Sequence, residues 1–186
     1  MVKFMSYDPW QFATTKNGYH ADEVISALQK CIRRGLEEKA SMFAYELYLT
    51  SPELEEKMWS RLMTISVEDI GLGNPMACVI VQNLNEIRKQ FDYLAVDRPL
   101  FFVHAIRVLC SSQKDRSSDL LKNIVMERIN QGDFEPIPDV ALDKHTRRGQ
   151  EMGRDLQHFL DEASKVVPEM EVDNEYKDRL LKMIQR

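Results

Sequence analysis

The apolar residues of this chain recur at helical spacing along almost its whole length. Two clear stripes of this kind are Val24, Ile25, Leu28 and Ile32, and then Leu54, Met58, Leu62 and Ile65. Steps of three or four residues place such side chains on one face of an α-helix. No segment shows the strict alternation of apolar and polar residues that a half-buried strand needs. The pattern predicts an all-α protein, a compact array of seven or eight helices.

Glycine, proline and capping residues divide the chain into these helices. Gly35 and Gly132 follow apolar stripes, where glycine commonly ends a helix. Ser51 followed by Pro52 is typical of a helix start. The expected helices span about 20–34, 36–49, 52–69, 74–91, 97–110, 118–131, 141–165 and 174–186. Pro136 and Pro138 exclude a helix in the intervening segment, which we expect to be extended.

The most distinctive stretch lies between the third and fourth of these helices. It contains Glu68, Asp69, Gly71, Asn74 and Pro75. The glycine supplies the freedom in φ that a sharp reversal needs, and asparagine before proline predicts a capped helix start. The two carboxylates lie at a helix C-terminus, where the macrodipole disfavours anions. We therefore expect an arginine partner or the N-terminus of the following helix beside them.

The carboxylate pair has two interpretations. In the first, Glu68 and Asp69 stabilise a helix–turn–helix corner through a salt bridge or a cap, which is the commoner role of charged pairs. In the second they act as general acid and base, which would require a concave pocket and a carboxyl group of raised pKa. The position of both residues at a corner favours the structural role.

Length and composition indicate an ordinary soluble protein. With 186 residues the chain is long enough to bury a substantial core as one domain. We expect an extended leader over 1–19, a helical core over 20–140, and a C-terminal helical extension over 141–186 packed on that core. Three cysteines without close pairing, and no signal peptide or membrane-spanning run, predict a reducing, cytoplasmic location.

The motifs of familiar enzymes are missing from the sequence. It has no phosphate-binding loop and no dinucleotide-binding glycine pattern. The four histidines, His20, His104, His145 and His158, are scattered and lack the spacing of a zinc site. We therefore expect no metal, no cofactor and no catalytic activity.

One electrostatic concentration lies near the C-terminus. It consists of Lys144, His145, Arg147, Arg148 and Arg154. On a continuous helix the four Lys and Arg residues would share about one third of the circumference. They are either a solvated face paired with nearby acids or a contact for phosphate, DNA or an acidic partner. The net charge of −5 argues against DNA binding through the overall field of the protein.

Several of these segments resemble the C-terminal region of the replication-associated recombination protein A (RarA/MgsA) family, whose members are AAA+ ATPases related to clamp loaders. The segment 66–75 is similar to the most characteristic C-terminal motif of that family and matches it at Ser66, Glu68, Asp69, Gly71 and Pro75. The segment 18–30 resembles the opening helix of the same region, and weaker similarity continues to about residue 153.

The resemblance implies a helical collar that self-associates and that serves DNA replication, recombination or repair. It does not imply ATP hydrolysis, because the ATPase module is missing from this sequence. Two departures stand out: the loop 112–116 lacks the proline-lysine-serine-asparagine pattern of the family, and residues 154–186 do not follow the family tail. The start at Met1 favours a collar encoded by itself over a fragment of a longer ATPase.

Three functional hypotheses follow. The first is a non-catalytic module that forms a homo-oligomer, a tetramer or dimer, or docks on an AAA+ ATPase. The second is a DNA- or phosphate-binding protein that uses the basic segment 144–154. The third, an acid/base enzyme built on Glu68 and Asp69, has the least support.

Overall fold

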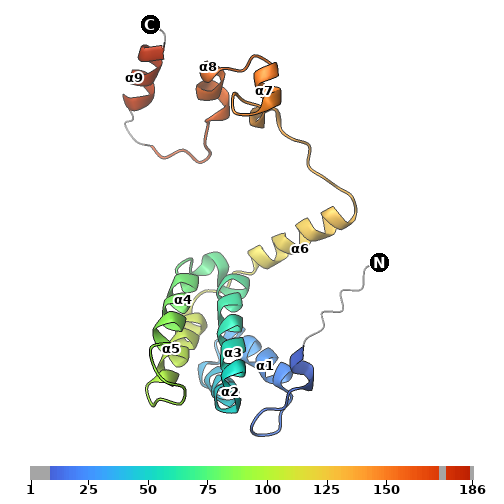
Figure 1. The fold of residues 1–186 in the computed structure, drawn as a ribbon, viewed down its shortest axis with the longest axis vertical. Coiled ribbons are helices and arrows are strands. Elements are labelled where there is room, and N and C mark those ends of the chain that lie inside the picture. The colour runs from blue at the N-terminus through green and yellow to red at the C-terminus, as the bar shows by residue number, and fades with distance from the viewer. Residues whose placement is uncertain (1–8, 172–174, 185–186) are drawn as a thin grey trace. The chain divides into compact units, whose positions relative to one another are not determined.

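A computed structural model describes residues 9–171 and 175–184, and helices make up most of this part of the chain (Figure 1). The α-helices are α1 Ala21–Arg33, α2 Glu37–Thr50, α3 Pro52–Ile65, α4 Ala77–Arg88, α5 Arg98–Ser111, α6 Ser117–Asn130, α7 Arg147–Glu151, α8 Leu156–His158 and α9 Glu175–Ile184. Within the described residues the structure holds no β-strand, only an isolated bridge between Thr14 and His20. The all-α prediction is confirmed.

The chain forms two compact units, residues 1–132 and 133–186. Part of the predicted leader, residues 1–8, lies outside the described residues, and Pro9–Phe12 forms a 3-10 turn. The predicted packing of the C-terminal extension on the core stays a prediction.

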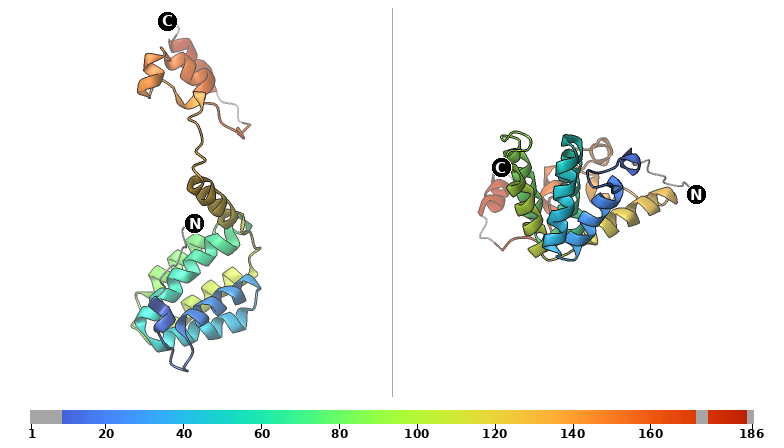
Figure 2. Two further views of the ribbon diagram at one scale, coloured as in Figure 1. Left: turned by 90° about the vertical axis from the view of Figure 1, so that its right-hand side faces the viewer. Right: turned by 90° about the horizontal axis from the view of Figure 1, so that it is seen from below.

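The first unit is a bundle of α1 to α5, which lie alongside one another in Figure 2. Its core contains the two apolar stripes seen in the sequence, and it is filled by large side chains such as Tyr48, Trp59 and Phe102. The Ser51 hydroxyl caps α3 by accepting a hydrogen bond from the Leu54 amide at 3.2 Å, as the Ser-Pro pair predicted.

A buried ion network holds three helices of the bundle in register. Glu55 of α3 accepts hydrogen bonds from Arg98 of α5 at 2.9 Å and lies 3.3 Å from the Arg88 guanidinium of α4. Arg88 also stacks over the Trp59 ring. The hydrogen bonds that Arg98 donates to Glu55 raise the pKa of Arg98. A buried carboxylate that loses its cation is very costly, so this network favours a single arrangement of α3, α4 and α5.

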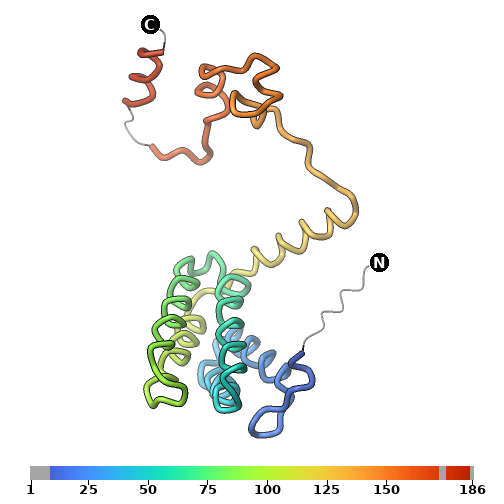
Figure 3. The backbone as a smooth tube through the Cα atoms, in the orientation of Figure 1, coloured from blue at the N-terminus to red at the C-terminus, as the bar shows by residue number. Residues whose placement is uncertain are grey.

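Two of the predicted helices differ from the structure. The fourth helix begins at Ala77, and Asn74 does not cap it, because its amide nitrogen donates instead to the Ser112 hydroxyl at 2.9 Å. The continuous helix expected over 141–165 is also absent. Within that segment α7 is separated from α8 by Gly153, at a φ of 74°, and by Asp155, which caps α8. The α8 helix then continues directly into a π-helical turn, Phe159–Ala163. Figure 3 follows the backbone through both regions.

Candidate functional site

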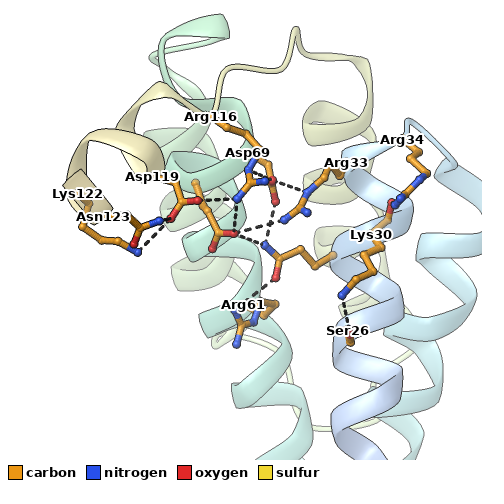
Figure 4. Close-up of polar contacts among 12 residues, drawn as sticks. Ser26, Lys30, Arg33, Arg34, Arg61, Asp69, Arg116, Asp119, Lys122 and Asn123 are labelled. Carbon is orange, nitrogen blue, oxygen red and sulfur yellow. Dashed lines mark hydrogen bonds and ion pairs between the residues drawn. The ribbon is translucent and has the colours of Figure 1, made fainter. Parts of the chain in front are cut away.

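Glu68 and Asp69 lie in a π-helical turn, Ser66–Ile70, that continues α3 into the corner. Two arginines from distant parts of the chain meet them there (Figure 4). Arg33 of α1 donates from Nε to Asp69 Oδ1 at 2.6 Å, and Arg116, at the start of α6, pairs with the same oxygen at 3.3 Å. Gln29 of α1 donates to both carboxylates at 2.9 Å. The expected arginine partner is therefore confirmed, and there are two of them, Arg33 and Arg116.

In the corner the carboxylates of Glu68 and Asp69 face the guanidinium groups of Arg33 and Arg116, and Arg116 pairs with Asp119 of α6 as well. Asp69 is fully buried, and both of its oxygens accept from these partners. Glu68 is partly exposed and lines a hollow of about 200 Å³ with Ser118 and Asp119 of α6. Asp69 does not line this hollow, so the pair does not present two carboxylates to a common space. The geometry therefore favours the structural interpretation over an acid/base pair.

Two glycines allow the loop before α6 to lie directly on the corner. A Cβ on Gly73 would lie 2.5 Å from the Gln113 carbonyl oxygen, and one on Gly71 would lie 2.7 Å from that of Asp115. Gly71 also has a φ of 49°, in the left-handed region that favours glycine. The predicted role of glycine at this reversal is therefore confirmed, with a second reason that the pattern did not reveal.

Asp115 connects the corner to the first turn of α6. Its carboxylate accepts from the Leu72 amide at 3.1 Å and from the amide and hydroxyl of Ser117, each at 2.9 Å. The Ser117 amide is the main reason that the pKa of Asp115 is lowered. The Asp115 amide donates to the Asp69 carbonyl at 3.1 Å. Together with Arg116, these bonds fix where α6 begins.

The α6 helix itself has no buried residue. Six of its apolar side chains are 42–61% exposed, namely Leu120, Leu121, Ile124, Val125, Met126 and Ile129. Monomeric soluble proteins rarely expose large contiguous apolar patches, and those that do usually bind another protein there. The apolar stripe that predicted this helix is thus a candidate contact surface.

The basic segment does not form one cationic face. Arg154 forms a two-pronged pair with the carboxylate of Asp139 at 2.6 and 2.7 Å and donates to the Leu142 carbonyl at 2.8 Å. Arg147 pairs with Glu151 at 2.8 Å on α7. The wheel argument that grouped these cations assumed a continuous helix and is wrong.

The other basic residues of the segment also lie apart. His145 contacts Asp143 through Nδ1 at 2.9 Å, and Lys144 lies over the Phe159 ring. Arg148 is exposed. The backbone of Gly149 lies very close to another segment, since a Cβ there would lie 1.9 Å from the Asp143 carbonyl oxygen. This turn explains why the segment cannot continue as one helix.

Three residues of the corner were not singled out from the sequence: Gln29, Asp115 and Arg116. Gln29 and Arg33 lie one helical turn apart on α1, and Asp115-Arg116 precede α6 as an ordinary polar loop. Long-range ion pairs of this kind leave no local periodicity. The lone arginine among the serines of 111–118 was the nearest available signal.

Residues 9–171 and 175–184 were also compared with the requirements of a metal site and of a membrane-spanning helix. No cluster of three or more His, Cys, Asp or Glu side chains in this part of the chain could hold a metal ion. None of the helices described is both long enough and apolar enough to cross a membrane.

Comparison with known proteins gives two matches. The family model described as "MgsA AAA+ ATPase C terminal" matches residues 35–182. Replication-associated recombination protein A of Bacillus subtilis (strain 168) is 30% identical over 147 residues, which cover 79% of this chain and 34% of that protein. The chain thus spans about a third of the length of the curated relative.

Proposed function

Because the chain belongs to the family of the MgsA AAA+ ATPase C-terminal domain, we propose that it is a non-catalytic helical module that acts through protein–protein contacts. The membership associates it with replication and recombination. The finer parts of the proposal are self-association as a homotetramer or dimer, or docking on an AAA+ ATPase, in the cytoplasm.

The observation that carries the proposal is the exposed apolar face of α6. A helix of 14 residues with no buried side chain has little reason to be stable alone in water. Its first turn is anchored at the corner by Asp115 and Arg116, so the helix is held in place while its apolar side chains remain uncovered. Burial of these side chains against another subunit would supply the missing stabilisation.

The test is sedimentation equilibrium over a concentration series of the full chain. We expect a dimer or tetramer for the wild type and a lower mass for Ile124→Glu, because a charge in the contact would have to be desolvated. Val79→Glu is the matched control, since Val79 is an exposed apolar residue of α4. Its mass should equal that of the wild type.

A wild type that is monomeric at every concentration would reject self-association. Docking on an ATPase would then be tested by co-sedimentation with a purified AAA+ ATPase of this family. Loss of that complex in Ile124→Glu alone is the expected result. If neither assembly forms, the proposal fails.

The DNA- or phosphate-binding alternative has weaker support. Most cations of the segment 144–154 already have acidic or aromatic partners within their own unit. Binding to DNA through them would first have to break these pairs.

A further inference from the structure

A second unpartnered apolar surface lies over α2 and α5, with Leu84 of α4 at one end. Three adjoining hollows mark it, of about 250, 400 and 420 Å³. The first two share Tyr45 and Leu49, and the last two share Val103, so the three hollows follow one another along this surface. We refer to it as the α2/α5 groove.

The groove exposes large apolar side chains along its length. Five lining residues are 43–93% exposed, namely Met42, Tyr45, Leu94, Val96 and Leu100. Within the first unit no described residue covers them. The bundle therefore presents a concave apolar surface, whereas α6 presents a convex one.

The dimensions of the two surfaces match. The α2, α5 and α6 helices each contain 14 residues. At 1.5 Å per residue each is about 21 Å long. A helix laid along a groove between two helices places its apolar ridges into the hollows, as in other helix–helix packing. The branched side chains of Leu120, Ile124 and Val125 are of the kind that fills such hollows.

The α6 helix cannot reach the groove of its own chain while the corner is intact. Its first residue follows Arg116, which pairs with Asp69, and Ser117 is bound to the Asp115 carboxylate that also holds Leu72. These bonds direct α6 away from α2 and α5, and Figures 1 and 2 show it leaving the bundle. The α6 helix of the same chain is therefore not the occupant of the groove.

We infer that α6 of one copy lies in the α2/α5 groove of a second copy. This inference rests on the proposed self-association and names its two surfaces. Such a contact is heterologous, because two different surfaces meet, and a repeat of it forms a ring of subunits if the rotation between them closes. A symmetric pairing of two α6 helices would instead leave the groove of every chain uncovered.

The available area fits a specific contact. A fully exposed large apolar side chain offers on the order of 100 Å². The six exposed side chains of α6 and the five of the groove are each about half exposed, so together they contribute roughly 600 Å² of apolar surface. Since about 60% of an interface is apolar, the whole contact would bury roughly 1,000 Å². This equals the lower bound of about 1,000 Å² for a specific interface, and each chain in a ring makes two such contacts.

The experiment is cross-linking between variants of the full chain that each carry one introduced cysteine, while the half-buried Cys31 and Cys110 stay in place. Cys78 is the exposed native cysteine and is replaced in the background Cys78→Ser. Burial raises the pKa of Cys110 to about 11, so this thiol reacts slowly. Ile124→Cys reports on α6, Met42→Cys on the groove, and Ser60→Cys, exposed on α3, serves as the control.

Two variants are mixed, allowed to exchange subunits, and treated with a short bis-maleimide. We expect a covalent adduct between the Ile124→Cys and Met42→Cys chains, and loss of that adduct when Ser60→Cys replaces Met42→Cys. The background alone should give none. Circular dichroism and sedimentation of each variant establish that folding and mass are unchanged.

The outcomes separate this inference from the proposed function. An oligomer in which Ile124→Cys cross-links only to itself would overturn the α6-in-groove contact but leave self-association standing. An oligomer without any cross-link at α6 would overturn the inference as well. A monomeric chain without adducts would overturn both this contact and self-association.

Discussion

The carboxylate of Asp69, fully buried at the end of α3, lies 3.3 Å from Nε of Arg116, the residue that precedes α6. This ion pair joins two segments 47 positions apart in the chain. It connects the most characteristic motif of the sequence with the helix whose apolar face is exposed. The motif therefore anchors α6, the helix that carries the proposed contact surface.

Replacement of Asp69 should destabilise the first unit. In Asp69→Ala the guanidinium groups of Arg33 and Arg116 lose a buried partner, and both are partly open to water, which relieves some of the cost. We expect the free energy of unfolding to fall by about 2–3 kcal/mol, measured by urea denaturation. Glu68→Ala should cost about 1 kcal/mol or less, since Glu68 is partly exposed. Equal effects would contradict the assignment of Asp69 as the central residue.

Replacement of Arg116 should loosen α6 without unfolding the bundle. In Arg116→Ala the ion pairs with Asp69 and Asp119 are lost. We expect faster amide hydrogen exchange in α6 and unchanged exchange in α1 to α5. Arg107→Ala, which removes an exposed pair with Glu37, is the control and should leave α6 protection unchanged. Unaltered exchange of α6 in Arg116→Ala would show that the anchor lies elsewhere.

A methyl group on Gly73 should separate the corner from the loop before α6. Since the added Cβ would lie 2.5 Å from a backbone oxygen, Gly73→Ala should lower the free energy of unfolding by about 2–3 kcal/mol. Gly132→Ala provides a comparison, because Gly132 also has a positive φ but a Cβ added there would have no neighbouring atom within 4 Å. Its cost should be about 1–2 kcal/mol. Denaturation midpoints of the two variants, with NMR shifts of Asp115 and Ser117, distinguish the effects.

Acidification should weaken the contact between the loop 14–19 and α2. Burial acts to raise the pKa of Glu46, but hydrogen bonds from Asn17 and Thr15 and the charge of Lys16 outweigh it and leave the pKa lowered. A carboxyl group with a lowered pKa stabilises the fold above its unfolded value of about 4.3. That stability is lost as the pH falls through the lower folded value.

The difference in unfolding free energy between wild type and Glu46→Gln should therefore shrink as the pH is lowered from 7 toward 3. Urea denaturation at successive pH values measures it. A difference that stays constant over this range would show that the Glu46 charge does not stabilise the loop.

Replacement of Arg154 should affect stability more than binding. Its side chain is largely buried and joins Asp139 to the Leu142 carbonyl, so Arg154→Ala should lower the stability of the C-terminal unit by about 1–2 kcal/mol. Arg148→Ala, at an exposed position, should change stability by less than about 0.5 kcal/mol. Thermal unfolding followed by NMR of the unit provides the readout. DNA binding that falls steeply with salt and is lost in Arg148→Ala would revive the nucleic-acid hypothesis.

The sequence by itself determined the helical class, most helix boundaries in the first unit, and the position of the corner. These follow from local rules: apolar spacing, the Ser51 cap and the glycines at chain reversals depend on neighbours within a few residues. The family resemblance was likewise carried by short motifs, and the comparisons confirm it.

Only the tertiary structure decided which partners the charged residues take. Asp69 meets Arg33 and Arg116, and Arg154 meets Asp139, through distances in sequence that no periodicity encodes. It also decided that the stripe of α6 is exposed and that the stripe of α3 is buried. Both stripes have the same spacing, because a helix face buried in a bundle and one left exposed can carry the same hydrophobic pattern.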